Sequence, residues 1–152
     1  MVKLGGSADY KKIFDVNLYG AGGFIAMGSS AKDSSWEVSF NYTLGETQNG
    51  LGIKRWRIGY NWDWRLNRFH FGFGPTLGHI VIERATSKYS LEGAFIGLDV
   101  HASFDFLKIS DNAAFYLGVG VNVDGQDFGP ALTLGIRADV LPKASPKKRS
   151  FR

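Results

Sequence analysis

Apolar and polar side chains alternate along most of the chain with a period of two residues. In residues 56–64 the even positions carry large apolar side chains, and the odd positions carry Arg57, Gly59, Asn61 and Asp63. The same alternation recurs in residues 96–106 and 115–124. A period of two places successive side chains on opposite faces of a β-strand. These segments therefore predict strands with one apolar face and one polar face.

The polar face is made of residue types that suit a crowded interior. It carries Gly, Asn, Ser, Asp, Arg and His, with few of the Lys, Glu, Thr and Gln residues expected on a water-facing sheet. The apolar face is then the outside of the sheet, where it needs lipid. Transmembrane β-barrels alternate in this way, with apolar side chains toward lipid and polar side chains toward the lumen.

Seven long alternating segments are predicted as strands. They cover residues 13–28, 35–45, 51–64, 67–83, 91–107, 112–124 and 130–141. Most exceed the roughly 5–6 residues of a soluble strand and reach the roughly 9–11 residues that a tilted strand needs to cross a membrane. The connections are of hairpin length, which favours an antiparallel meander. Because an open edge would leave unpaired backbone groups in lipid, we expect the sheet to close.

An even number of strands would bring both ends of the chain to one side of the barrel. Residues 2–8 can supply an eighth strand, with residues 9–12 as a tight turn. Short connections at residues 65–68 and 108–112 are expected on the side of the chain ends, and longer ones at residues 46–50, 84–90 and 124–130 on the other side. We predict an all-β fold: a closed antiparallel up-and-down transmembrane barrel of eight strands over residues 1–141. Residues 142–152 are expected to form a basic, disordered tail.

One segment does not fit a single register. In residues 67–83 three phenylalanines set the odd positions outward, and that register would also send His79 toward lipid. The Gly-rich stretch before Pro75 offers a place for a β-bulge, because Pro cannot donate to a ladder. A one-residue slip there would turn His79 inward and Ile80 and Ile82 outward.

Composition narrows the function classes. The 152 residues suggest one domain, and the absence of Cys excludes disulfides and thiolate metal sites. The formal net charge is +4, but residues 143–152 carry five Lys and Arg residues and no acid. The barrel itself is therefore close to neutral, and it lacks the basic face that nucleic-acid binding requires.

Aromatic side chains gather at one end of the predicted barrel. The residues that flank the two short turns on the apolar face are Trp62, Trp64, Phe69, Phe104, Phe106 and Phe115, and Trp36 joins them at the entry to its strand. Aromatic rings at the level of the lipid head groups form the belts of membrane barrels. With its alternation, strand lengths and aromatic belt, the chain resembles the small eight-stranded outer-membrane β-barrels of Gram-negative bacteria. It departs from them where the last strand ends, at Val140 and Leu141, because many members end on an aromatic residue.

The resemblance implies localisation in the bacterial outer membrane. It also implies contact with membrane lipid or lipopolysaccharide, no nucleic-acid partner, and a monomer with a non-enzymatic structural or interaction role.

The inward polar face supplies the candidate site. The expected interior charge network consists of Arg55, Arg57, Asp63, Asp99, His101, Asp105, Arg137 and Asp139, and the other inward polar residues are Asp15, Asn17, Glu37, Asn61, His70 and Asn122. An eight-stranded barrel has an interior only wide enough for side chains. Because an isolated buried charge is costly, opposite charges are expected to pair and to plug the lumen.

A catalytic hypothesis rests on alternate positions of one strand. Asp99, His101 and Ser103 nominally supply an orienting acid, a base and a nucleophile. His101 and Ser103 also match the His-x-Ser element of the lipid A deacylases, a family of eight-stranded barrels, but Phe104 follows where that family has Asn. The three His residues lack metal-ligand spacing, and no cofactor or metal is expected.

Three alternatives to the non-enzymatic barrel stay open at this point. They are a soluble lipocalin-like barrel that binds an apolar ligand, a barrel enzyme like the lipid A deacylases, and a narrow pore.

Overall fold

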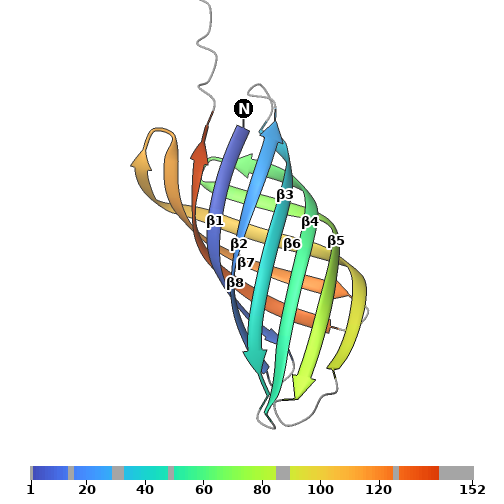
Figure 1. Ribbon diagram of the computed structural model, residues 1–152. Coiled ribbons are helices and arrows are strands. Elements are labelled where there is room, and N and C mark those ends of the chain that lie inside the picture. The colour runs from blue at the N-terminus through green and yellow to red at the C-terminus, as the bar shows by residue number, and fades with distance from the viewer. Residues whose placement is uncertain are drawn as a thin grey trace, which may run out of the picture.

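The protein is a closed eight-stranded β-barrel. A computed structural model describes residues 2–13, 16–28, 33–47, 50–84, 90–124 and 127–140. The strands are β1 (Val2–Ile13), β2 (Val16–Gly28), β3 (Ser34–Glu46), β4 (Leu51–Leu66), β5 (Phe69–Arg84), β6 (Ser90–Ser110), β7 (Ala113–Asp124) and β8 (Asp127–Asp139). Each strand pairs antiparallel with the next, and β8 closes the barrel by pairing with β1 (Figure 1). This confirms the predicted fold class.

No helix in the described part of the chain is long and apolar enough to cross a membrane.

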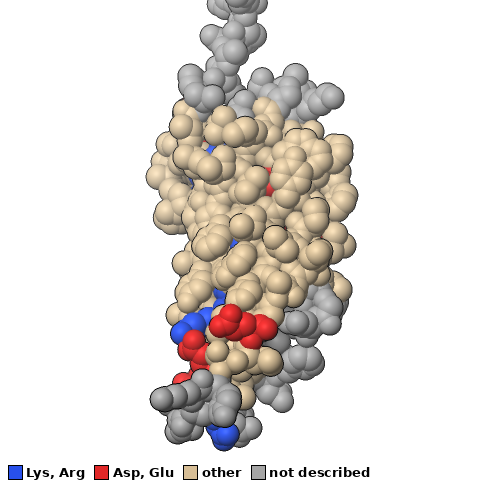
Figure 2. All heavy atoms as spheres, turned by 45° about the vertical axis from the view of Figure 1, so that its right-hand side comes forward, with Lys and Arg blue, Asp and Glu red and all other residues tan. Residues whose placement is uncertain are grey.

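The two faces of the barrel wall are inverted relative to a soluble barrel. Among the described residues, fourteen polar or charged residues are buried, against six apolar ones. On β4, Ile58 and Tyr60 are 43% and 49% exposed, whereas Asn61 and Asp63 are 1% and 6% exposed. Figure 2 shows a wall almost bare of charge, with acidic and basic side chains gathered at one end. A lipocalin-like barrel needs an apolar interior, so that alternative is wrong.

Both ends of the barrel chain lie at the same end of the barrel, as the strand count predicts. This end, called the termini end below, also holds the turns at Asn67–Arg68 and at residues 111–112 (Figure 1). The opposite end holds the strand ends Ile13 and Val16, Glu46 and Leu51, Arg84 and Ser90, and Asp124 and Asp127. The longer loop expected at residues 124–130 is wrong, because Asp124 and Asp127 already pair across β7 and β8.

Strand β1 is longer than expected, so the predicted turn at residues 9–12 is wrong. Lys11 pairs in register with Leu18 of β2 and with Ala131 of β8. Its side chain is only 4% exposed and points into the barrel. In β2 the even positions point inward, with Leu18 fully buried, so Asn17 lies on the outer side. Asn17 was expected inside; its Oδ1 instead accepts a hydrogen bond of 2.9 Å from the hydroxyl of Tyr10.

The bulge expected near Pro75 is also absent. The pairs Gly59–Thr76 and Trp62–Phe73 keep one register between β4 and β5. His79 therefore stays on the outer face, where its ring stacks on Trp56 at 5.9 Å and its Nε2 lies 3.9 Å from Glu92. With these partners His79 is accommodated on the outer face, and no slip of the register is needed to turn it inward.

Because the register does not slip, Ile80 and Ile82 point inward. They pack against Leu18 and Ile53, which form a small buried apolar cluster toward the end opposite the termini. Register irregularities occur instead between β6 and β7, after Asp105 and after Lys108.

The aromatic belt near the termini end is confirmed. Trp36 stacks on Tyr60 with 5.1 Å between ring centroids and lies 4.8 Å from Trp62. Trp62 and Trp64 stack at 5.5 Å, and Trp64 stacks on Phe73 at 5.4 Å. Such rings suit the boundary between lipid head groups and hydrocarbon.

Candidate functional site

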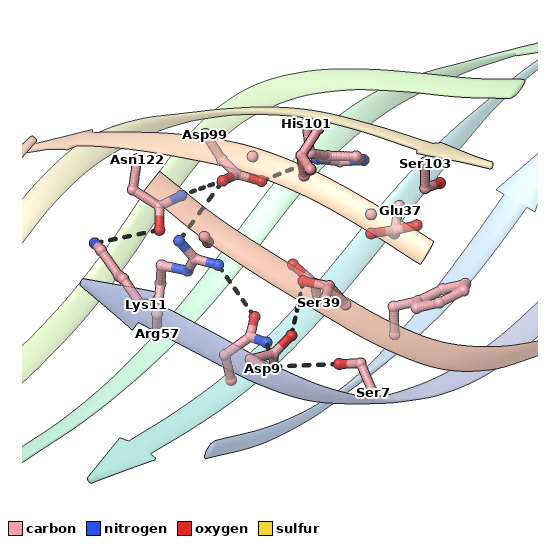
Figure 3. A pocket seen from close by; sticks show the side chains of 18 of the residues that line it. Ser7, Asp9, Lys11, Glu37, Ser39, Arg57, Asp99, His101, Ser103 and Asn122 are labelled. Carbon is pink, nitrogen blue, oxygen red and sulfur yellow. Dashed lines mark hydrogen bonds and ion pairs between the residues drawn. The ribbon is translucent and has the colours of Figure 1, made fainter. Parts of the chain in front are cut away.

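The candidate site is the polar lumen of the barrel. Inward side chains line a cavity of about 120 Å³, and its polar lining comes from β1, β3, β4, β6, β7 and β8 (Figure 3). Strand alternation delivers one side chain in two to this space, and barrel closure brings strands that are distant in sequence to face one another. The chemistry of the site therefore depends on which inward side chains meet.

His101 of β6 lies between two carboxylates. Its Nδ1 lies 3.0 Å from Oδ2 of Asp99, two residues along the same strand, and its Nε2 lies 3.1 Å from Oδ1 of Asp63 on β4. A neutral imidazole can donate a hydrogen bond from only one nitrogen. Two carboxylate neighbours therefore suit the doubly protonated, positively charged ring, which links β4 and β6 through the lumen.

Asp99 continues the chain of contacts. Its Oδ1 lies 3.6 Å from Nη1 of Arg57 and accepts a hydrogen bond from the side-chain amide of Asn122. The Asn122 oxygen lies 3.5 Å from Nζ of Lys11, within hydrogen-bond reach. Asp99 thus lies within reach of two positive charges, Arg57 and His101, in a space largely closed to water.

Asp9 ends the chain of contacts on the far side of the lumen. Arg57 donates to the Asn41 oxygen at 3.3 Å, and the Asn41 nitrogen donates to Asp9 at 2.6 Å. Ser7 and Thr133 donate to Asp9 at 3.2 and 2.9 Å. We call the connected set the lumen network; its members are Ser7, Asp9, Lys11, Asn41, Arg57, Asp63, Asp99, His101, Asn122 and Thr133 (Figure 3).

A second set of contacts surrounds Arg137 of β8. Its Nε lies 2.9 Å from Oδ1 of Asp105, and the other oxygen of Asp105 lies 3.3 Å from Nε2 of His70. Arg137 also donates to Oγ of Ser103 at 2.7 Å, and its guanidinium lies 4.1 Å from the ring centre of Tyr116. These five residues are called the Arg137 cluster below.

Two predicted members of the charge network make other contacts. The guanidinium of Arg55 lies over the ring of Phe95 at 4.3 Å. Asp139, near the end of β8, is the cross-strand partner of Lys3, whose side chain is 5% exposed. Asp15 and the predicted tail at residues 142–152 fall outside the described residues.

Sequence reasoning missed the contribution of β1 to the lumen. Lys3, Ser7, Asp9 and Lys11 share one face of that strand and point inward. Their odd-numbered positions, which place them on one face of a strand, were visible in the sequence. They were overlooked because a turn at residues 9–12 interrupted the alternation.

Glu37 of β3 is a buried carboxylate of a different kind. It is 8% exposed and lines the cavity. In Figure 3 it lies near His101 and Ser103, but no hydrogen bond or ion pair joins it to another residue that the structure describes. Its charge is therefore not compensated by a direct contact of the kind that holds Asp63 or Asp99.

The contacts do not assemble the catalytic constellation considered from the sequence. A nucleophile must lie within hydrogen-bond reach of its base. Ser103 instead contacts Arg137, while both ring nitrogens of His101 face carboxylates. Within the described ranges, no group of three His, Asp or Glu side chains is arranged to hold a metal ion.

Known structures with this fold are small outer-membrane barrels. Neisserial surface protein A is 14% identical, with a TM-score of 0.58 over 90% of this chain and 94% of that one. Ail, the attachment invasion locus protein of Yersinia pestis, is 13% identical, with a TM-score of 0.60 over 90% and 95%. The N-terminal β-barrel domain of OprF from Pseudomonas aeruginosa is 14% identical, with a TM-score of 0.52 over 90% and 96%.

The chain has the fold of the small outer-membrane β-barrels. At sequence identities of 13–14%, the similarity to these structures shows the fold alone. No protein-family model matches the sequence, and no curated protein matches it.

Proposed function

We propose that the protein is a non-enzymatic barrel of the bacterial outer membrane with a structural or interaction role. The observation that carries this proposal is the inversion of the barrel wall. Large apolar side chains such as Phe40, Trp62 and Leu134 are 49%, 39% and 51% exposed, while Arg55 and Asp63 are nearly buried. In water such a surface would form an apolar patch far larger than a soluble monomer tolerates. In a bilayer the same surface meets hydrocarbon.

We further propose that paired charges plug the lumen. The lumen network reaches from β1 and β8 to β4 and β6, so that it crosses the interior. The Arg137 cluster fills the space nearer the termini end, and the Leu18–Ile53 cluster fills the lumen toward the opposite end. These three layers argue against a continuous water path, and therefore against the pore alternative.

An interaction role would use the end opposite the termini. Charges of both signs gather there, with Lys54 and Glu83 in contact at 2.6 Å and His79 near Glu92 (Figure 2). Ail has also been solved with the heparin analogue sucrose octasulfate, with 15% identity to this chain. Because acidic side chains lie beside the basic ones among the described residues of this end, a partner with both acidic and basic groups fits it.

Reconstitution tests the membrane proposal. The full chain is diluted from urea into plain buffer and into lipid vesicles, and strand content is followed by circular dichroism together with protease resistance. We expect a folded, protease-resistant barrel only with vesicles. A folded monomer in plain buffer would refute the proposal.

A second assay tests the absence of enzymatic activity. The folded protein is incubated with lipopolysaccharide, and released fatty acid is measured. We expect no release. Release that disappears in the Ser103→Ala variant would make the protein an acyl hydrolase.

A further inference from the structure

An apolar groove of about 640 Å³ lies on the outside of the barrel wall. A single row of cross-strand neighbours runs along it. The row is Trp64, Phe71, Ala102, Val119, Leu132 and Tyr10, each paired in register with the next. The groove therefore crosses β4, β5, β6, β7, β8 and β1 on the face that is exposed to lipid.

The hollow arises from the size of the side chains in this row. Ala102 contributes a single methyl group between Phe71 and Val119. Aromatic rings from β4 and β5 form one wall, and Tyr10 with residues 130–132 forms the other. A small residue between large ones leaves a depression that the protein does not fill.

The groove runs obliquely across the membrane. Tyr10 lies near the end of β1 that faces away from the termini, and Trp64 lies near the end of β4 at the termini end. Five strand spacings separate these residues, which corresponds to about 24 Å along the row. Because the row is oblique, its height along the membrane normal is smaller than this length.

A cationic side chain, that of Lys12, lies beyond one end of this groove. Lys12 is exposed and lies two residues from Tyr10 on the same outward face of β1. Strand alternation directs both side chains to the lipid side. An ammonium group at the edge of an apolar groove is complementary to a molecule with a hydrocarbon chain and an anionic head group.

We propose that the groove binds an acyl chain of lipopolysaccharide, with a phosphate of its lipid A at Lys12. This inference rests on the proposed function. In an outer-membrane barrel the end opposite the termini faces the outside of the cell, and Lys12 lies on that side. A second copy of the chain fits less well, because both barrel walls are convex and a stable interface buries about 800 Å² on each partner. A flexible acyl chain can follow a narrow oblique depression.

Native mass spectrometry tests the proposal on the full chain. The protein is reconstituted into nanodiscs of phosphatidylcholine with either lipopolysaccharide or phosphatidylglycerol, and retained lipid is measured after release into mild detergent. We expect one retained lipopolysaccharide molecule on the wild-type barrel and little retained phosphatidylglycerol. Ala102→Trp, which fills the hollow, should abolish retention, and the smaller Ala102→Leu should reduce it.

Ala21→Trp is the matched control. Ala21 is also an outward-facing alanine, between Ala8 and Tyr42, and does not line the groove. This variant should retain lipopolysaccharide like the wild type. Lys12→Gln should weaken retention about fivefold, as expected for one cation near an anionic head group.

Three outcomes would overturn the inference. They are equal retention by Ala102→Trp and wild type, phosphatidylglycerol retention equal to that of lipopolysaccharide, or a protein dimer in place of the retained lipid. Circular dichroism and protease resistance of each variant in the nanodisc separate these outcomes from a failure of the barrel to insert, which would contradict the proposed function itself.

Discussion

His101 on β6 and Asp63 on β4 meet in the barrel lumen, with 3.1 Å between Nε2 and Oδ1. The same ring holds Asp99 at 3.0 Å through its other nitrogen. Strands β4 and β6 are not neighbours in the barrel, since β5 lies between them. The contact therefore adds a connection that the backbone ladders do not provide.

Replacing His101 should destabilise the barrel strongly. His101→Phe keeps a ring of similar size but removes the cation between Asp63 and Asp99, so that Asp99 keeps Arg57 and Asp63 loses its ion pair. Removing one partner of a buried charge pair costs about 3–5 kcal/mol, and the 23% exposure of the His101 side chain points to the lower part of that range. Urea midpoints in lipid vesicles measure the effect. His79→Phe, on the outer face, is the control and should change the midpoint little; equal midpoints would contradict the role given to His101.

Gly72 should prove necessary for the same contact. A Cβ at Gly72 would collide with Oδ1 of Asp63 and with the His101 ring. Gly72→Ala should therefore push His101 away from Asp63 and lower the urea midpoint. In the control Gly6→Ala, the added Cβ meets only the Gly22 oxygen, at 3.8 Å, so little change is expected. If Gly72→Ala and Gly6→Ala behave alike, the contact does not depend on the space that Gly72 leaves.

The barrel could be predicted from the sequence because lipid-facing apolar residues and lumen-facing polar residues alternate in every strand of a membrane barrel. On β4, Arg55, Asn61 and Asp63 lie inside and Ile58 and Tyr60 outside, as the alternation requires. A single slip would place every charge in lipid, so the register is strongly specified.

Prediction failed where a side chain had a partner on another strand. Lys11 looked like a turn residue because Asn122, which lies within reach of it, is more than a hundred positions away in sequence. His79 seemed misplaced toward lipid because its stacking on Trp56 depends on the pairing of β4 with β5. The pairing of Ser103 with Arg137, and not with His101, likewise depends on barrel closure and rotamers.

Glu37 and Asp99 should respond differently to loss of charge. Glu37→Gln removes a buried carboxylate that has no direct partner among the described residues, so stability should stay the same or rise. Asp99→Asn removes the counter-charge of Arg57 and His101 and should cost roughly 3 kcal/mol. Urea titrations of both variants in vesicles make the comparison. A larger loss for Glu37→Gln would mean that the Glu37 carboxylate itself stabilises the lumen.

The assignment of faces predicts that substitutions at neighbouring positions of β4 differ in their effect on membrane insertion. Ile58 is 43% exposed on the lipid side, and Asn61 is 1% exposed in the lumen. An Arg near the bilayer midplane costs about 2–4 kcal/mol, so Ile58→Arg should impair insertion. Asn61→Ala only alters packing in the lumen and should insert normally. Insertion yields from protease protection in vesicles compare the two; the face assignment fails if Ile58→Arg inserts as well as Asn61→Ala.

Because layers of side chains close the lumen, we can predict which substitutions would open it to ions. The wild-type barrel should show no conductance steps in a planar bilayer, because the Leu18–Ile53 cluster, the lumen network and the Arg137 cluster block the path in series. Arg57→Ala should remain closed, since the apolar cluster still excludes water. Leu18→Gly should also remain closed, since the charge pairs still fill the centre. Only the Leu18→Gly, Arg57→Ala, Arg137→Ala triple variant is expected to conduct, because it opens all three layers. Conductance by the wild type would refute the plug and favour a pore, and conductance by Arg57→Ala alone would assign the closure to the charges without the apolar layer.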